Sequence, residues 1–199
     1  GPQELAGLTA AQVAGIRNFT LTEADRLQTT LGDGLDNVLV GHDWGDSIDG
    51  GAGHDDISAG ASDDRVLGNL GDDTLLAGTG GDFVAGGAGN DLLLGEAGND
   101  EIYLGTGNDT AGGGTGDDLL FGGAGSHKIW GGFGDDTVQG GSGADDIVGG
   151  PGRNQLFGND GNDTLTAGSE GDSLGGGAGN DLIYGGTGND TIFAGTGND

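Results

Sequence analysis

The stretch Gly86-Gly87-Ala88-Gly89-Asn90-Asp91-Leu92-Leu93-Leu94 reads Gly-Gly-x-Gly-x-Asp-x-aliphatic-x, and this nine-residue unit recurs along most of the chain. With the Asp at the sixth position and the aliphatic at the eighth, the first repeat is placed at residues 31–39. Val40 is then a one-residue insertion, and the period runs without a slip from Gly41 to Asp199. An internal repeat of this length indicates a solenoid.

The eighth position tests the register. From Val38 in the first repeat to Ile192 in the last complete one, only Ala111 is not a large aliphatic residue there. Glycines at positions one, two and four permit positive φ angles and sharp turns. Positions seven to nine predict a short strand whose eighth residue points one way and whose ninth points the other. One such strand buries little, but stacked copies can share a thin aliphatic core.

Residues 31–199 resemble the repeats-in-toxin (RTX) family of bacterial secreted proteins, whose calcium-binding repeat is this nonapeptide. The resemblance implies an all-β fold: a right-handed parallel β-roll (a β-solenoid) with two nonapeptides per turn and a short N-terminal cap or flank. It also implies multiple Ca²⁺ ions between neighbouring loops, held by sixth-position carboxylates and loop carbonyls. The metal ligands so implied are Asp36, Asp46, Asp55, Asp64, Asp73, Asp82, Asp91, Asp100, Asp109, Asp118, Asp136, Asp145, Asp163, Asp172, Asp181, Asp190 and Asp199.

Composition supports a need for cations. The chain has 52 Gly among 199 residues, a formal net charge of −28 and 32% hydrophobic residues, which together resemble a disordered polyanion. Ordering the backbone costs about 1–2 kcal/mol per residue, which one aliphatic side chain per repeat cannot offset. Stacked carboxylates and carbonyls form a hard-oxygen environment that suits Ca²⁺. The alternative, a merely solvated Asp surface, does not explain why Asp recurs at one phase of the repeat.

The acidic charge also argues against nucleic acids and anionic membranes as direct partners. No apolar run is long enough for a membrane span, and no cleavable signal peptide is visible. Gly1-Pro2 resembles the scar left by a protease site, so we expect a fragment of a larger protein. The chain has no Cys, which is compatible with export in an unfolded state.

Two regions are expected, an N-terminal flank or cap at 1–30 and the calcium-binding β-roll at 31–199. Within the flank, residues 8–16 have roughly helical apolar spacing, with Thr9 as a plausible N-cap. Residues 19–22 alternate like a strand, and residues 23–30 could be a degenerate turn of the solenoid. An open solenoid needs a cap, so we favour a cap or the tail of a preceding domain over a separate binding segment.

Two repeats lose the sixth-position carboxylate, one to His127 and one to Asn154. The three basic residues of the array, Arg65, Lys128 and Arg153, all lie in degraded repeats. One hypothesis is that these cations partly replace calcium charge, and the equal alternative is drift in a tolerant array. His127 as a transition-metal ligand is less favoured, because no second His stands in its column.

Two further substitutions fall at position four, where Trp44 and Glu170 replace Gly. They are expected to distort their loops and to weaken calcium binding there.

Position nine points outward and carries aromatic residues. On one face these are Tyr103, Phe121, Phe157 and Phe193, and on the other they are Trp130 and Tyr184. Such a stripe could mark a partner surface, including one for self-association. Same-face stacking between neighbouring strands is the favoured interpretation.

No catalytic site is expected. Residues 171–175 match the Gly-x-Ser-x-Gly nucleophile pattern, but they lie in register with the repeat and no His is placed to serve as base. The sequence also lacks the His-Glu-x-x-His zinc signature.

The favoured function, as the resemblance implies, is a calcium-binding module of a larger type I-secreted bacterial protein. Such a module folds on extracellular Ca²⁺ and assists export and folding. Its partners would be calcium, the rest of the parent polypeptide and the type I secretion machinery, and its location would be extracellular or at the bacterial cell surface. The alternative is a structural or adhesive stalk of a cell-surface or surface-layer protein. Ice binding is a third possibility, weakened because the Thr residues at position three form no continuous column.

Overall fold

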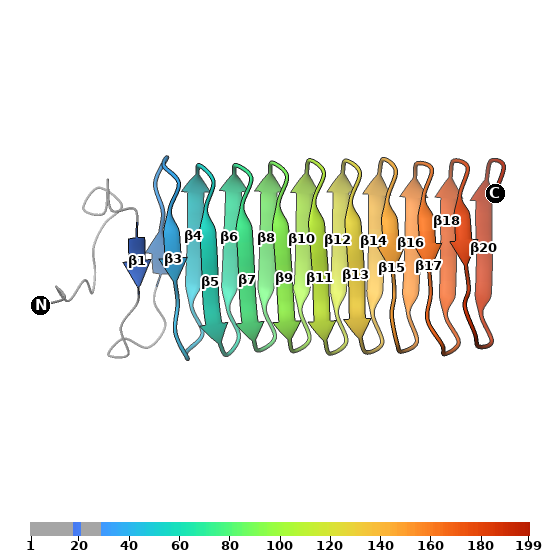
Figure 1. Ribbon diagram of the computed structural model, residues 1–199, viewed down its shortest axis with the longest axis horizontal. Coiled ribbons are helices and arrows are strands. Elements are labelled where there is room, and N and C mark those ends of the chain that lie inside the picture. The colour runs from blue at the N-terminus through green and yellow to red at the C-terminus, as the bar shows by residue number, and fades with distance from the viewer. Residues whose placement is uncertain (1–17, 21–28) are drawn as a thin grey trace, which may run out of the picture.

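The computed structural model describes residues 18–20 and 29–199, and over these residues the chain consists of strands and turns. Within that described part there is no helix that could cross a membrane. The strands form two ten-stranded sheets that both run the length of a rod and overlap as two layers in Figure 1.

Successive strands alternate between the two sheets. The first sheet contains β1 (Asn18–Thr20), β3 (Val38–Val40), β5 (Asp56–Ala61), β7 (Thr74–Thr79), β9 (Leu92–Ala97), β11 (Thr110–Thr115), β13 (Lys128–Phe133), β15 (Asp146–Val148), β17 (Thr164–Thr166) and β19 (Leu182–Tyr184). The second sheet contains β2 (Thr29–Leu31), β4 (Ser47–Ala52), β6 (Arg65–Leu70), β8 (Phe83–Ala88), β10 (Glu101–Thr106), β12 (Leu119–Ala124), β14 (Thr137–Ser142), β16 (Gln155–Asp160), β18 (Ser173–Ala178) and β20 (Thr191–Thr196).

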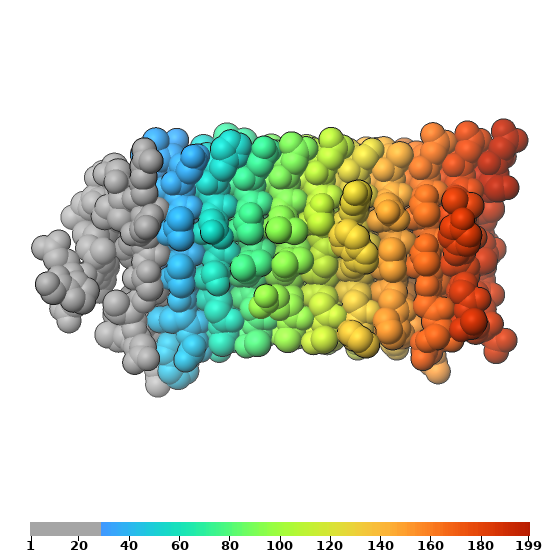
Figure 2. Space-filling model, viewed as in Figure 1, coloured from blue at the N-terminus to red at the C-terminus, as the bar shows by residue number. Residues whose placement is uncertain are grey.

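Every strand pair is parallel, and from β2 onward each pair joins residues that are two repeats apart in sequence. In β10, for example, Ile102 lies opposite Val84 on one side and Leu120 on the other. The chain therefore makes one turn for every two nonapeptides, and successive turns occupy successive bands along the rod (Figure 2). The predicted all-β parallel solenoid is confirmed.

The glycine pattern sets the turns between strands. Gly89, at position four, has a φ of +144°, and a Cβ there would run into the backbone of Gly71 one turn earlier. In the repeat at 59–67, Ser62 occupies position four and has a φ of +74°. Among the described residues it is the one non-glycine residue at position four with a positive φ. Close stacking of backbones therefore requires glycine, or a residue that tolerates this conformation.

Position eight contributes one core side chain to each strand, as predicted. These residues are fully buried from Ile48 to Leu174, and the small Ala111 is buried with them. Position one also faces inward, a contribution that the nine-residue pattern did not reveal because glycine usually fills it. Leu104, Ala59 and Ala77 at that position are completely buried.

The placement of the first repeat was wrong by one residue. Leu39 is 2% exposed and pairs with Ile57, whereas Val38 is 40% exposed. The buried Asn37, not Asp36, therefore stands at position six, and the period runs back from Gly41 without an insertion. Because neighbouring residues of a strand face opposite sides, a run of three aliphatic residues at 38–40 did not indicate which one is buried.

Strand pairing extends into the region expected to be a flank. Phe19 of β1 lies opposite Leu39, and Thr30 of β2 lies opposite Ile48 and is buried. The predicted strand at 19–22 overlaps β1, while the predicted helix at 8–16 lies outside the described residues. The two sheets therefore begin N-terminal to residue 31.

Candidate metal centre

The sixth-position side chains stack in two columns, each at the edge where a loop enters a strand. The first column, leading into the first sheet, contains Asn37, Asp55, Asp73, Asp91, Asp109, His127, Asp145, Asp163, Asp181 and Asp199. The second column contains Asp46, Asp64, Asp82, Asp100, Asp118, Asp136, Asn154, Asp172 and Asp190. All except Asp190 and Asp199, in the last turn, are buried. The predicted carboxylates are thus brought together, apart from Asp36, which stands at position five.

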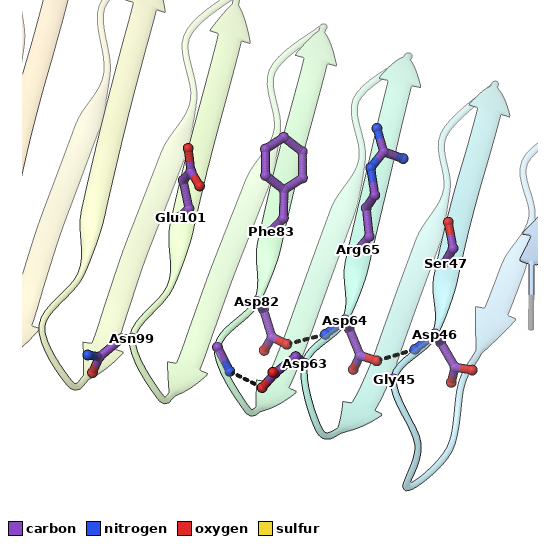
Figure 3. A pocket seen from close by; sticks show the side chains of 11 residues that line it. Gly45, Asp46, Ser47, Asp63, Asp64, Arg65, Asp82, Phe83, Asn99 and Glu101 are labelled. Carbon is purple, nitrogen blue, oxygen red and sulfur yellow. Dashed lines mark hydrogen bonds between the residues drawn. The ribbon is translucent and has the colours of Figure 1, made fainter. Parts of the chain in front are cut away.

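Apart from Asp46, each aspartate of the two columns accepts a backbone N–H from the preceding turn through Oδ1, and these contacts form a hydrogen-bond ladder. The backbone N–H of Asp64 donates to Oδ1 of Asp82 at 2.7 Å, and the N–H of Asp46 donates to Oδ1 of Asp64 at 2.6 Å (Figure 3). In the first column, the N–H of Asp73 donates to Oδ1 of Asp91 at 2.9 Å. The ladder ties each loop to the next one along the rod.

The other oxygen, Oδ2, has no such partner. It is buried without a hydrogen bond in Asp55, Asp64, Asp73, Asp82, Asp91, Asp100, Asp109, Asp118, Asp136, Asp145, Asp163 and Asp181. A buried acceptor without a donor is costly, and a buried charge without a counter-charge more so. A bound cation or a proton would therefore compensate the buried charge of these twelve oxygens.

Burial also changes the acidity of these carboxyls. Desolvation raises the pKa of Asp91, Asp100 and Asp118 from 3.8 to about 6, although the ladder N–H opposes the shift. Desolvation likewise raises the pKa of Asp64 to about 7. A cation at each oxygen would favour the ionised form and reverse this shift.

The surroundings of Oδ2 supply further oxygens. A Cβ built on Gly86 would meet both Oδ2 of Asp91 and the carbonyl oxygen of Leu104, one turn further on. Among the described residues, no three His, Cys, Asp or Glu side chains form a ligand cluster, so a bound ion would need backbone carbonyls as well. An all-oxygen set of carboxylate and carbonyls is the chemistry that Ca²⁺ prefers, and the residues present fit it.

A second ladder, at position five, was missed by the sequence reasoning. The backbone N–H of Asn90 donates to Oδ1 of Asp72 at 2.7 Å, and the N–H of Asn108 donates to Oδ1 of Asn90 at 3.0 Å. Here the side chain accepts from the following turn, whereas at position six it accepts from the preceding turn. The frequent Asn or Asp just before the sixth-position Asp was the available signal.

The loops with Trp44 and Glu170 at position four differ from the others, as predicted. Neither residue has the positive φ found at Ser62 and the position-four glycines. In both loops the sixth-position Oδ2 accepts an N–H from its own second position, at 3.0 Å for Asp46 and 3.2 Å for Asp172. These two oxygens are therefore already satisfied within their loops.

His127 takes the sixth position in the first column and stays buried. Its Nδ1 lies 3.3 Å from the backbone N of Asp109 and 3.2 Å from Oδ2 of Asp109. An unprotonated Nδ1 accepts from that N–H, and a protonated one donates to that carboxylate.

Two of the three basic residues of the array lie on the outer surface of a strand. Arg65 and Lys128 occupy position seven and are exposed. The guanidinium of Arg65 lies 5.4 Å from the centre of the Phe83 ring. Both belong to the outer face of the sheet rather than to a loop column.

A shallow groove of about 400 Å³ follows part of the second column (Figure 3). Asp63, Asn99 and Glu101 line it together with Phe83 and the sixth-position aspartates of three turns. It is the outer side of the carboxylate column and forms no enclosed pocket.

The outward aromatic residues stack in part. The rings of Tyr103 and Phe121, on paired strands, are stacked at 4.9 Å, and Phe83 lies 5.5 Å from Tyr103. Trp130 and Phe193 are 43% and 66% exposed. Same-face stacking thus accounts for one group of aromatics and leaves the other group on the surface.

Ser173, of the Gly-x-Ser-x-Gly pattern, lies in β18 with its Asp172 neighbour in the second column. No helix follows it in the described chain, so the strand-turn-helix geometry of a nucleophile elbow is missing.

Comparison with known families agrees with this geometry. The family described as "RTX calcium-binding nonapeptide repeat (4 copies)" matches residues 31–61, 40–75, 76–111, 112–147, 139–174 and 166–199. Comparison with curated proteins gave no match. The matched segments together span residues 31–199, the part that carries both columns. The chain therefore belongs to the RTX calcium-binding nonapeptide repeat family.

Proposed function

We propose that this chain is a calcium-driven folding module of a larger exported bacterial protein. Its unfolded form carries a formal charge of −28 and little apolar surface, so it would stay open where calcium is scarce. Calcium outside the cell would fill the two columns and fold the roll, which would assist export and the folding of the parent chain. The sixth-position aspartates are the proposed ligands, with the loop carbonyls beside them. Asp36, exposed at position five, lies outside both columns and is not part of that set.

One observation carries the proposal, namely the twelve buried Oδ2 atoms that have no hydrogen-bond partner. They recur in most loops of both columns, which an accidental packing defect would not do. If an ion is present at ten times its dissociation constant, each site adds about 1.4 kcal/mol to the folded state. Extracellular calcium modules typically bind at about 10⁻⁴ to 10⁻³ M, so secretion into such calcium would switch the fold.

Far-UV circular dichroism during a calcium titration tests the proposal, starting from chelated protein and using magnesium as the control. We expect a sharp transition from coil to β structure that magnesium does not reproduce, because Mg²⁺ demands a tighter octahedral site. A chain that is already β-structured in chelator would contradict folding on calcium.

The exposed aromatic residues favour a second candidate function, a structural or adhesive stalk at the cell surface. Trp130 and Tyr184, on the outer face of the first sheet, are 43% and 52% exposed. Solution mass in the presence of calcium discriminates between the candidates. A persistent monomer favours the folding module, and ordered assembly favours the stalk.

A further inference from the structure

Asn154 keeps its place in the second column although it lacks a carboxylate. The backbone N–H of Asp136 donates to Oδ1 of Asn154 at 3.0 Å, and the N–H of Asn154 donates to Oδ1 of Asp172 at 2.7 Å. The ladder therefore passes through the asparagine without a break. Because the Asp136 N–H needs an acceptor, these contacts also fix which amide atom is the oxygen.

The amide nitrogen of Asn154 then points into its own loop. Nδ2 donates to the carbonyl oxygen of Gly150 at 3.0 Å and to that of Gly152 at 3.3 Å. In the aspartate loops on either side in sequence, Oδ2 of Asp145 and Oδ2 of Asp163 are buried without a partner. The asparagine thus satisfies both of its polar atoms where an aspartate leaves one unsatisfied.

Nδ2 occupies the same place as those unpartnered oxygens. A Cβ built on Gly149 would meet Nδ2 of Asn154, just as a Cβ on Gly158 would meet Oδ2 of Asp163. The substitution therefore exchanges an acceptor for a donor at one point of the loop and leaves the shape of the side chain unchanged.

A neighbouring loop also contacts this one through a hydrogen bond. Oε2 of Glu170, in the next loop of the column, accepts the backbone N–H of Gly152 at 3.2 Å. The pKa of Glu170 is lowered by its hydrogen bonds from Ser169 and Gly152 and by the nearby charge of Arg153. The loop therefore contains a cationic side chain and a hydrogen-bonded tie to the next turn.

We propose that the Asn154 amide is a built-in substitute for calcium, so that the roll binds no ion within the 149–154 loop. An ion there would face the N–H groups of Nδ2, and the loop carbonyls would already be engaged. For Oδ1 to become a ligand, the amide would have to turn over and leave the Asp136 N–H without an acceptor. This inference rests on the proposed function. Under it, Asn154 is the residue that prevents a calcium ion from binding in this loop.

Calcium stoichiometry of the chain and its variants, measured by equilibrium dialysis with metal analysis, tests the inference. Asn154→Asp restores the carboxylate, and we expect this variant to bind one more calcium ion per chain than the unsubstituted chain. Asn162→Asp is the matched control, because it makes the same chemical change at an exposed fifth-position residue whose Oδ1 accepts the Asn180 N–H. We expect the control to leave the count unchanged.

The Asn154→Ala variant tests whether Asn154 replaces a calcium ion or is itself a calcium ligand. It removes the two Nδ2 hydrogen bonds and the Oδ1 that accepts the Asp136 N–H, so we expect the calcium concentration at half-folding to rise while the number of ions stays the same. Loss of one ion in this variant, or an unchanged count in Asn154→Asp, would overturn the inference while leaving the proposed function intact. If the unsubstituted chain itself binds no calcium, the proposed function fails and the inference fails with it.

Discussion

Asp91 lies one turn beyond Asp73 and accepts the Asp73 backbone N–H through Oδ1 at 2.9 Å, while its own Oδ2 is buried without a partner. The two oxygens of one carboxylate therefore have different tasks. Oδ1 connects the turns of the roll, and Oδ2 is left for a cation. Repetition of this arrangement along both columns couples the stacking of loops to the binding of ions.

Replacing Asp91 with Asn tests whether Oδ1 and Oδ2 have these separate roles. Asp91→Asn retains the Oδ1 acceptor but removes the charge, so we expect the loss of one calcium ion and a lower stability. At ten times the dissociation constant the lost site is worth about 1.4 kcal/mol. The measurement is the calcium concentration at half-folding, followed by circular dichroism. The matched control is Asp72→Asn, an exposed position-five carboxylate of the same column whose Oδ1 accepts the Asn90 N–H. An equal effect of both variants would show that net charge, not position, controls binding.

Glycine is predicted to be required at those position-four sites where the backbone of the preceding turn lies against it. Gly98 has a φ of +143°, and a Cβ there would overlap the carbonyl oxygen of Gly80. We expect Gly98→Ala to destabilise the roll by at least roughly 1–3 kcal/mol, the usual cost of a strained backbone conformation. Thermal unfolding in saturating calcium measures this. The control is Gly34→Ala, where nothing lies within 4 Å of the added Cβ. A Gly98→Ala chain as stable as the control would contradict the stacking geometry.

Acid is predicted to replace calcium in part. Burial raises the pKa of Asp82 and Asp136 from 3.8 to about 6, and that of Asp64 to about 7. Because the folded state binds these protons more tightly than the unfolded state, the stabilisation is complete below the unfolded pKa and is lost as the pH rises through 6 to 7. In chelator, the β signal should therefore increase as the pH falls. Calcium affinity should decrease over the same range, because protons compete for the same oxygens. A chelated chain that loses structure on acidification would contradict this assignment.

The thin core makes each position-eight residue important. Leu120 is completely buried between Ile102 and Val138, and truncation to Ala should cost about 2–5 kcal/mol. Leu119 faces outward from the same strand and is half-buried, so Leu119→Ala is the matched control and should cost much less. Chemical denaturation in saturating calcium gives both values. Similar losses would mean that the sheets do not bury one face as described.

Much of this structure could be predicted because the repeat determines it. The uninterrupted period placed Asp91 and its equivalents in register and Leu93 in the core. The first repeat was the exception, since the aliphatic run at 38–40 fits either face, and Asp36 resembles a sixth-position carboxylate more than Asn37 does. Continuing the period back from Gly41 would have resolved the choice.

Other features depend on contacts that a repeat pattern does not contain. The inward direction of Leu104 follows from the path of the strand beyond position nine. The role of Asn154 depends on hydrogen bonds to Gly150 and Gly152, which only the loop geometry reveals. The stacking of Tyr103 on Phe121 was anticipated as one of two alternatives, and the exposed Trp130 shows why neither alternative describes every aromatic residue.

Anomalous scattering from crystals of the calcium-loaded chain tests the central claim most directly, because it locates the ions themselves. The account predicts peaks beside the unpartnered Oδ2 atoms in both columns, repeated from turn to turn and missing within the loop of Asn154. Peaks confined to the outer surface, with none beside Oδ2 of Asp91 or its equivalents, would contradict it.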